Sequence, residues 1–466
     1  MSATTIAPVQ ELVEHALAVS TADDCIVIAH HTTSANLRWA NNTLTTNGSM
    51  RRIDIAVVSF VRQAGGPAAG SMSGSATTPE QVGALVAAAD AEARAADPAT
   101  DAQELVGDVA GSDWAEPPAE TDIHVFDRFA PALGEAFGRA RSGDRVLYGF
   151  VDHRLTTTYV ASSTGLRLRH VQPTGHYGCT GKTADLTNSA WVGGATRDFV
   201  GVDALALESE LERRLGWGSR RVDLPAGRYD TILPPTAMAD LMIDAYWYAG
   251  ARDAHDGQSV FSRRGGGTRV GEPVARPEVT LSSDPAYPGL ECAAHVVNES
   301  SDNDGSVFDT GIPLARTEWI SGGTLSALRQ TRETAALTGL PVTPSIDNLV
   351  LDVAGASESL DDLVAATERG LLLTCLWYIR AVDPQTLLLT GLTRDGIYLV
   401  ENGEITGAAN NFRFNESPVD LLRRFSHASA TLPAFSREWG DDYFSRTAMP
   451  ALRVPDFNMS SVSQAR

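Results

Sequence analysis

Basic residues are scarce in this sequence of 466 residues. It has 37 lysines and arginines against 58 aspartates and glutamates, which gives a formal net charge of −21. A nucleic-acid-binding face must neutralise phosphates with clustered cations. The basic spots here are isolated pairs, at Arg51-Arg52, Arg213-Arg214 and Arg263-Arg264. The composition therefore argues against a partner made of nucleic acid.

Long apolar runs and paired cysteines are also missing. No stretch of about eighteen apolar residues could span a bilayer, and the first residues lack the basic start and apolar core of a signal peptide. Four isolated cysteines, Cys25, Cys179, Cys292 and Cys375, are typical of a chain that stays in a reducing compartment. We therefore expect a cytoplasmic protein without a membrane contact.

Several common catalytic motifs are absent as well. None of the ten histidines is followed by glutamate, so there is no His-Glu-x-x-His zinc motif, and there is no Gly-x-Ser-x-Gly nucleophile elbow. The segment Gly175–Thr183 ends in Gly-Lys-Thr, but His176 stands where a phosphate-binding loop needs glycine. We predict a loop between strands there.

What remains is a chain long enough for two or three domains, with helices and strands in separate runs. The predicted fold class is α+β. We expect an amino-terminal α+β domain in residues 1–97, with Gly65–Gly74 as a loop, and an acidic linker in 98–120. A strand-rich middle segment follows in 121–222, then a larger β-rich carboxy-terminal domain in 223–457 and a frayed tail in 458–466.

The most apolar predicted helix follows a short strand and two prolines. Tyr229–Leu233 is an apolar run, and Pro234-Pro235 ends it because proline has no N–H for the strand ladder. Thr236 is then a candidate N-cap for a helix over Ala237–Tyr248. Its apolar side chains occupy more than one stripe, which predicts burial in a core or at a large interface.

This strand, proline turn and helix resemble one place in the TldD/PmbA family of bacterial metallopeptidases. In the zinc-binding branch of that family, the helix carries a His-Glu-x-x-x-His motif, whose positions correspond here to Ile243, Asp244 and Tyr248. Isoleucine has no lone pair, and zinc prefers nitrogen, sulfur or carboxylate ligands. The family's third ligand is a cysteine near the carboxy terminus, and Thr447–Phe457 contains none. The resemblance therefore points to the PmbA (TldE-like) branch, which lacks the metal motif.

The resemblance continues through the last third of the chain in the family's order. The matching strings are Gly311-Ile312-Pro313, Gly322-Gly323-Thr324-Leu325, Trp377-Tyr378-x-Arg380-x-Val382-Asp383, Leu389–Gly396, Glu401–Ile405 and Asn411–Asn415 followed by Ser417. Asn402-Gly403 is a good type I′ hairpin turn between two of the predicted strands.

The resemblance implies a role within a peptidase assembly. Chains of the PmbA type pair with a zinc-bearing TldD-like subunit and act on unfolded or short peptides, so we expect no cofactor in this chain and zinc in the partner. The chain could also form a homodimer when alone. Two alternatives remain open: a stand-alone peptidase with an unrecognised site, and a non-catalytic peptide-binding module.

Three polar residues of the carboxy-terminal strings are candidates for substrate binding. Arg394, Arg413 and Asn415 follow or lie in predicted strands, and an arginine fork suits peptide carboxylates and carbonyl groups. The alternative is that these residues tie neighbouring strands together. No catalytic residue and no metal ligand is predicted in this chain.

Overall fold

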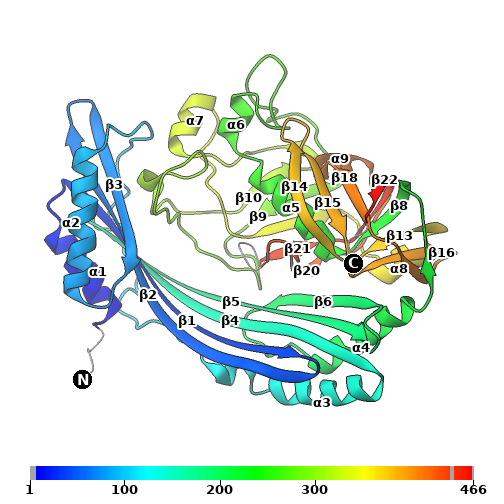
Figure 1. Ribbon diagram of the computed structural model, residues 1–466. Helices are drawn as coiled ribbons and strands as arrows, with labels where there is room; N and C mark the ends of the chain where they lie inside the picture. Colours follow the sequence, from blue (N-terminus) through cyan, green and yellow to red (C-terminus); the bar gives the residue numbers. More distant parts are fainter. Residues whose placement is uncertain (1–6, 441–445, 464–466) are drawn as a thin grey trace.

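The computed structural model describes residues 7–440 and 446–463. It contains 22% helix and 40% strand, with helices lying on the faces of several sheets, which confirms the predicted α+β class. In Figure 1 a long curved sheet from the amino-terminal half lies beneath the carboxy-terminal domain. Within the described ranges, no helix is both long and apolar enough to cross a membrane.

Six antiparallel strands form the curved sheet of the amino-terminal half. Their spatial order is β3-β2-β1-β4-β5-β6. The bounds are β1 Asp24–Ala40, β2 Thr43–Gln63, β3 Gly66–Ser75, β4 Arg145–Ser162, β5 Arg167–Thr183 and β6 Ser189–Thr196. Asn41 and Asn42 connect β1 to β2 with φ of 50° and 56°, a conformation that asparagine tolerates better than most residues.

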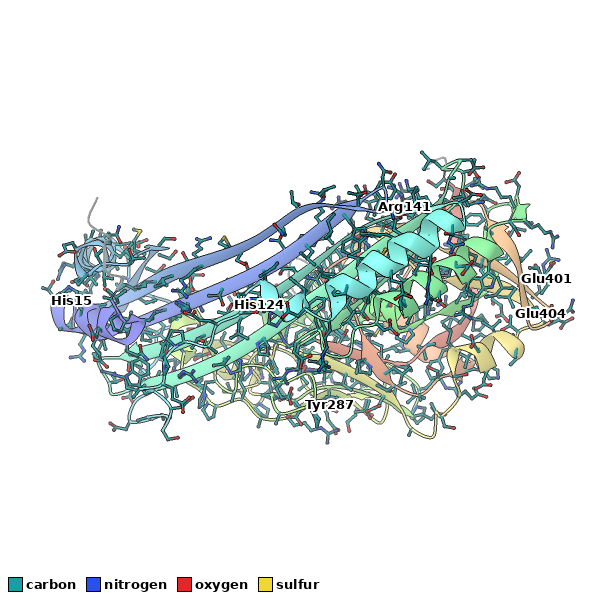
Figure 2. All side chains as sticks on the ribbon, turned by 90° about the horizontal axis from the view of Figure 1, so that it is seen from below. His15, His124, Arg141, Tyr287, Glu401 and Glu404 are labelled. Carbon is teal, nitrogen blue, oxygen red and sulfur yellow. The ribbon has the colours of Figure 1, made fainter. Side chains whose placement is uncertain are left out.

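Because successive side chains of a strand point to opposite faces, the two faces of this sheet pack against different parts of the molecule. On β1, Val27, Ala29 and Leu37 pack among residues of the helices, whereas Ile26 and Ile28 belong to a cluster shared with the carboxy-terminal domain. Figure 2 shows the outer face, with the helix that carries Arg141 lying along it. The helices are α1 Val9–Val19, α2 Pro79–Ala95, η1 Ile123–Phe126, α3 Phe129–Ser142 and α4 Ala204–Trp217.

The expected division between residues 1–97 and 121–222 is not seen, because strands from both segments form this one sheet. Two predicted loops also lie in strands: Gly65–Gly74 is mostly β3, and Gly175–Thr183 is part of β5. Hydrogen bonds to neighbouring strands hold these segments in the sheet, although glycine by itself has a low strand propensity. Glycine suits these strands because helices pack closely on them, and a Cβ on Gly70 would lie 2.2 Å from the Ala93 nitrogen of α2.

Two further sheets build the carboxy-terminal domain around helix α5, Pro235–Trp247. One has ten strands: β7 Arg221–Val222, β8 Gly227–Leu233, β13 Arg369–Leu373, β14 Leu376–Asp383, β15 Leu388–Thr393, β16 Ile397–Glu401, β17 Glu404–Ala409, β18 Phe412–Glu416, β19 His427–Ala428 and β22 Leu452–Val462. The other has six: β9 Val279–Ser283, β10 Thr317–Ser321, β11 Thr324–Leu325, β12 Leu349–Val353, β20 Leu432–Ala434 and β21 Thr447–Met449. The short helices are α6 Ala251–His255, η2 Val307–Asp309, α7 Arg332–Thr338, α8 Leu360–Ala365 and α9 Pro418–Arg424.

Two local predictions in this domain need correction. The expected frayed tail begins inside β22, which pairs with β8 and β18 and runs to Val462. Residues 464–466 lie outside the described part of the chain. Helix α5 begins at Pro235 with Pro234 as its N-cap, so Thr236 is already helical. Proline is well suited to the first helical position because that N–H has no partner inside the helix.

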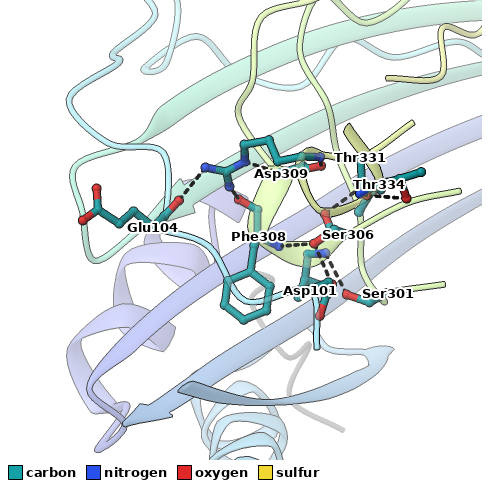
Figure 3. A network of polar contacts seen from close by, with 11 residues as sticks. Asp101, Glu104, Ser301, Ser306, Phe308, Asp309, Thr331 and Thr334 are labelled. Carbon is teal, nitrogen blue, oxygen red and sulfur yellow. Dashed lines mark hydrogen bonds and ion pairs between the residues drawn. The ribbon is translucent and has the colours of Figure 1, made fainter. Parts of the chain in front are cut away.

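The acidic segment 98–120 is irregular, but it is anchored to the carboxy-terminal domain. Figure 3 shows the network near Asp101 and Glu104. Ser306 Oγ donates to Asp101 Oδ2 at 2.7 Å, and Arg332 Nη1 donates to the Glu104 carbonyl oxygen at 2.9 Å. Phe308 packs next to this network on the amino-terminal sheet, with its ring centroid 5.0 Å from that of Phe60. The segment therefore helps to hold the two halves together.

Candidate functional site

Helix α5 is the buried centre of the carboxy-terminal domain. Every residue from Ala237 to Tyr246 is buried, which confirms the predicted burial of this helix. The helix contacts β8 of the ten-stranded sheet and β20 and β21 of the six-stranded sheet. Tyr246, near its end, accepts a hydrogen bond from the Ile346 N–H at 2.8 Å and donates to the Ile346 carbonyl oxygen at 3.1 Å. The helix is thus held rigidly between the two sheets.

The three positions that the resemblance assigns to the zinc motif have different surroundings. Ile243 is fully buried in the main apolar core, Asp244 is 4% exposed, and Tyr248 is the C-cap residue, where the helix has ended. Within residues 7–440 and 446–463, no three His, Cys, Asp or Glu side chains are grouped as metal ligands would be. With isoleucine in the core and tyrosine at the cap, the described donor set does not fit a zinc ion held by this helix.

Two carboxyl groups on the same face of α5 form the polar centre of the candidate site. Asp240 and Asp244 are one helical turn apart. Ser436 Oγ donates to Asp240 Oδ1 at 2.6 Å, and the Glu438 N–H donates to the same oxygen at 3.0 Å. The Trp439 indole N–H donates to the Asp240 carbonyl oxygen at 3.1 Å. The segment after β20 therefore wraps over this face of the helix.

Burial changes the acidity of both aspartates. Loss of hydration raises the pKa of Asp240 to about 7, opposed by the hydrogen bonds from Ser436 and Glu438. Burial likewise raises the pKa of Asp244 to about 7, and the neighbouring Glu438 charge adds to that rise. The second oxygen of each carboxyl group, Oδ2, is buried without a hydrogen-bond partner in the described structure. Near neutral pH these groups can therefore hold or release protons.

The residues on either side of Ser436, Phe435 and Arg437, join a stack of aromatic rings that reaches the amino-terminal sheet. The Arg437 guanidinium carbon lies 3.9 Å from the ring centroid of Trp377 and 5.3 Å from that of Trp191 on β6. Phe435 stacks on the His176 ring of β5 with centroids 5.8 Å apart. Helix α5, the segment after β20 and the amino-terminal sheet thus meet at one place, which we call the stack contact.

The three predicted substrate-binding residues share no hydrogen-bond partner among the described residues: two of them contact Thr390, and the third contacts Trp377. On β18, Arg413 Nη1 donates to Thr390 Oγ1 at 3.2 Å, and Asn415 Oδ1 accepts from the same hydroxyl group at 2.8 Å. Those two residues link β18 to β15, as the alternative interpretation expects. Arg394 follows β15 in the chain, and its guanidinium carbon lies 5.4 Å from the Trp377 ring centroid rather than on Thr390. Substrate binding by the three residues stays a prediction.

Sequence reasoning did not identify Asp240, Ser436 or Arg437. The only available signal was two aspartates four residues apart in an otherwise apolar helix, because such a pair must be buried together. Ser436 is 196 residues away from Asp240 in the chain, so no local pattern connects them. Cys375, by contrast, is a buried thiol whose pKa is raised by burial, so it is not poised as a nucleophile.

Solved structures share the fold over almost the whole chain. TldE from Thermococcus kodakarensis is 16% identical, with a TM-score of 0.76 over 97% of this chain and 99% of that one. A proposed modulator of DNA gyrase from Thermotoga maritima is 15% identical, with a TM-score of 0.73 over 97% and 99%. Another from Bacteroides thetaiotaomicron is 14% identical, with a TM-score of 0.72 over 97% and 98%. No curated protein matches the sequence significantly.

The sequence itself carries a family signature in its second half. The model of the PmbA/TldA metallopeptidase C-terminal domain matches residues 226–461, which is just over half of the chain. This range contains helix α5, the whole six-stranded sheet and the ten-stranded sheet except for β7 and the last residue of β22. The resemblance found in the strand, proline turn and helix is thereby confirmed, and the chain belongs to the TldD/PmbA metallopeptidase family.

Proposed function

We propose that this chain is the TldE-like subunit, without metal, of a cytoplasmic peptidase assembly that cleaves unfolded or short polypeptides. The main support for this proposal is the surroundings of the positions that correspond to the two histidines of the motif. Ile243 is part of the apolar core and Tyr248 caps the helix. The similarity in fold to TldE from Thermococcus kodakarensis supports the same assignment.

The chemistry of such an assembly divides between two subunits. Peptide hydrolysis by a zinc enzyme needs a metal with an open coordination position, which activates water for attack on the carbonyl group. In the proposal a TldD-like partner supplies that metal. This chain supplies rigid walls and assembly contacts, for which a helix locked between two sheets is suited.

Co-purification with a relative that carries His-Glu-x-x-x-His tests the proposal. We expect zinc in the relative and none held stoichiometrically by this chain, and cleavage of an unfolded peptide only when the relative is present. Cleavage by this chain alone, at a rate unaffected by chelators, would favour the stand-alone peptidase. Failure to associate with any zinc-bearing relative would favour the peptide-binding module.

A triple substitution asks whether a dormant metal site survives. Ile243→His, Asp244→Glu and Tyr248→His restore the motif letters, but two histidines five residues apart are about 140° apart on a regular helix. We expect no tightly bound zinc and no cleavage from the triple variant alone, because Ile243 has become part of the core. Stoichiometric zinc together with cleavage would contradict this expectation and would identify a lapsed enzyme.

A further inference from the structure

A second candidate site is a cavity whose lining does not include the α5 carboxyl groups. It has a volume of about 880 Å³ and lies where the β5–β6 connection and the end of α4 face β16 and β17. Its polar lining includes Lys182, Arg221, Arg394, Tyr398 and Asn410. Pockets for organic ligands commonly have volumes of about 300–1,000 Å³. The cavity is therefore large enough for several residues of a peptide.

Polar groups without partners line this cavity. Tyr398 is 2% exposed, and its hydroxyl group has no hydrogen-bond partner in the described structure. Asn410 Oδ1 accepts from the Leu224 N–H at 2.6 Å, whereas its Nδ2 is buried and unpartnered. Arg394 Nε makes no hydrogen bond either, but it forms an ion pair with Asp395. Since buried polar groups are normally satisfied, the Tyr398 hydroxyl group and the Asn410 amide group point to a ligand that can accept hydrogen bonds.

The charges around the cavity give the same indication. The Lys182 ammonium group lies 5.8 Å from the Tyr148 ring centroid and has no ion pair among the described residues. Arg221 donates to the neutral oxygens of Thr187 and Asn188 rather than to a carboxylate. Asp395 accepts from Ser189 and lies beside Arg394, with 3.3 Å between Nε and Oδ2. Two cations are thus left without an acidic partner in a chain of charge −21.

We propose that this cavity binds the carboxylate end of a peptide. The carboxylate would accept hydrogen bonds from the unpartnered donors, with Lys182 and Arg221 providing the compensating charge. Apolar side chains in the same lining, Leu186, Leu215 and Ile397, would contact the peptide's own side chains. The size of the cavity and this mixed lining favour a peptide end over a bare anion. The proposal does not depend on a zinc-bearing partner.

Fluorescence anisotropy of the full chain with labelled Ala-Ala-Leu-Ala-Ala tests the proposal directly. We expect saturable binding of the peptide with a free carboxylate and at least about tenfold weaker binding of its C-terminal amide, the loss expected for one charge-assisted hydrogen bond. Equal binding of acid and amide would overturn the proposal, as would no saturable binding up to about 1 mM.

Variants locate the site. Lys182→Gln and the double variant Lys182→Gln with Arg394→Gln should weaken binding by about three- and tenfold, because each removes a cation from the lining. Arg264→Gln, which removes an exposed arginine elsewhere, is the matched control and should leave binding unchanged. Circular dichroism checks that the variants are folded. The single variant Lys182→Gln leaves the contact of Arg394 with Trp377 intact, so its effect on binding does not depend on that contact. An equal loss in the Arg264→Gln variant, or competition by inorganic phosphate as strong as that by unlabelled peptide, would overturn the assignment.

Discussion

Two of the contacts between the halves of the molecule differ in how well their polar groups are satisfied. At the first, which we call the anchor contact, Phe308 and Arg332 join the carboxy-terminal domain to the amino-terminal sheet and the acidic segment. At the second, the stack contact, the Arg437 guanidinium group contacts the rings of Trp377 and Trp191, and its charge acts on Asp240 of α5. Both combine buried rings with an arginine.

The anchor contact is fully paired. The Arg332 Nε donates to Asp309 Oδ1 at 2.6 Å, its Nη1 donates to the Glu104 carbonyl oxygen, and its Nη2 donates to the Phe308 carbonyl oxygen. At the stack contact, the Oδ2 atoms of Asp240 and Asp244 and the Nε of Arg437 are buried without hydrogen-bond partners in the described structure. A contact that serves stability is usually satisfied, whereas unsatisfied buried groups concentrate at functional positions. The difference therefore separates a structural contact from a candidate functional one.

Removal of the Phe308 ring should have the largest effect and would show that the anchor contact carries stability. Phe308 is 1% exposed and packs in the cluster that joins the two halves. We expect Phe308→Ala to lower the free energy of unfolding by about 4 kcal/mol, the usual cost of emptying a buried phenylalanine site. Urea denaturation measures the loss. Leu186→Ala, at a position 59% exposed, is the control and should cost less than about 0.5 kcal/mol.

The stack contact should instead make stability depend on pH. The pKa values of Asp240 and Asp244 are raised from 3.8 to about 7, so the folded chain binds more protons than the unfolded chain in this window. Stabilisation by the protonated groups is complete below about pH 4 and is lost as the pH rises through 7. We expect Asp240→Asn to remove about 2 kcal/mol of the fall in unfolding free energy between pH 5 and pH 8.

Comparison of urea denaturation at the two pH values gives this difference. The asparagine Oδ1 can still accept from Ser436 and Glu438, so the variant should be more stable than wild type at pH 8. Asp420→Asn, which removes a carboxylate 60% exposed on α9, is the matched control. Parallel pH profiles for wild type and Asp240→Asn would show that the α5 carboxyl groups do not titrate as described.

The smallest effect should come from the arginine of the stack contact. Arg437→Met removes a guanidinium group from between two indole rings, at a cost of about 1 kcal/mol. It also removes a positive charge that lowers the pKa of Asp240, so the pH-dependent loss of stability should move to higher pH. Arg437→Lys keeps the charge but not the planar stack, and should lose stability without that movement. Identical pH midpoints for wild type and Arg437→Met would contradict the interpretation.

Local sequence patterns were sufficient where neighbours in the chain decide the structure. The helix after Pro234-Pro235 was expected because proline ends the strand and suits a helix start. The Asn402-Gly403 hairpin turn is present, with φ of 54° and 81°, as its two residue types indicate. The strand Gly66–Ser75 was missed, because its pairing with β2 and its close packing on α2 are tertiary facts. Glycine patterns alone indicate a loop.

By itself, the sequence determined the family, and it predicts the motif positions, because the resemblance assigns Ile243, Asp244 and Tyr248 by their distance from one strand and two prolines. The tertiary structure alone decided what surrounds them. It brings Ser436 and Arg437 to α5 from nearly 200 residues away, and it places Arg437 against Trp191 of the amino-terminal sheet. The pKa of a carboxyl group depends on burial and on neighbouring charges, and these exist only after distant segments have packed together.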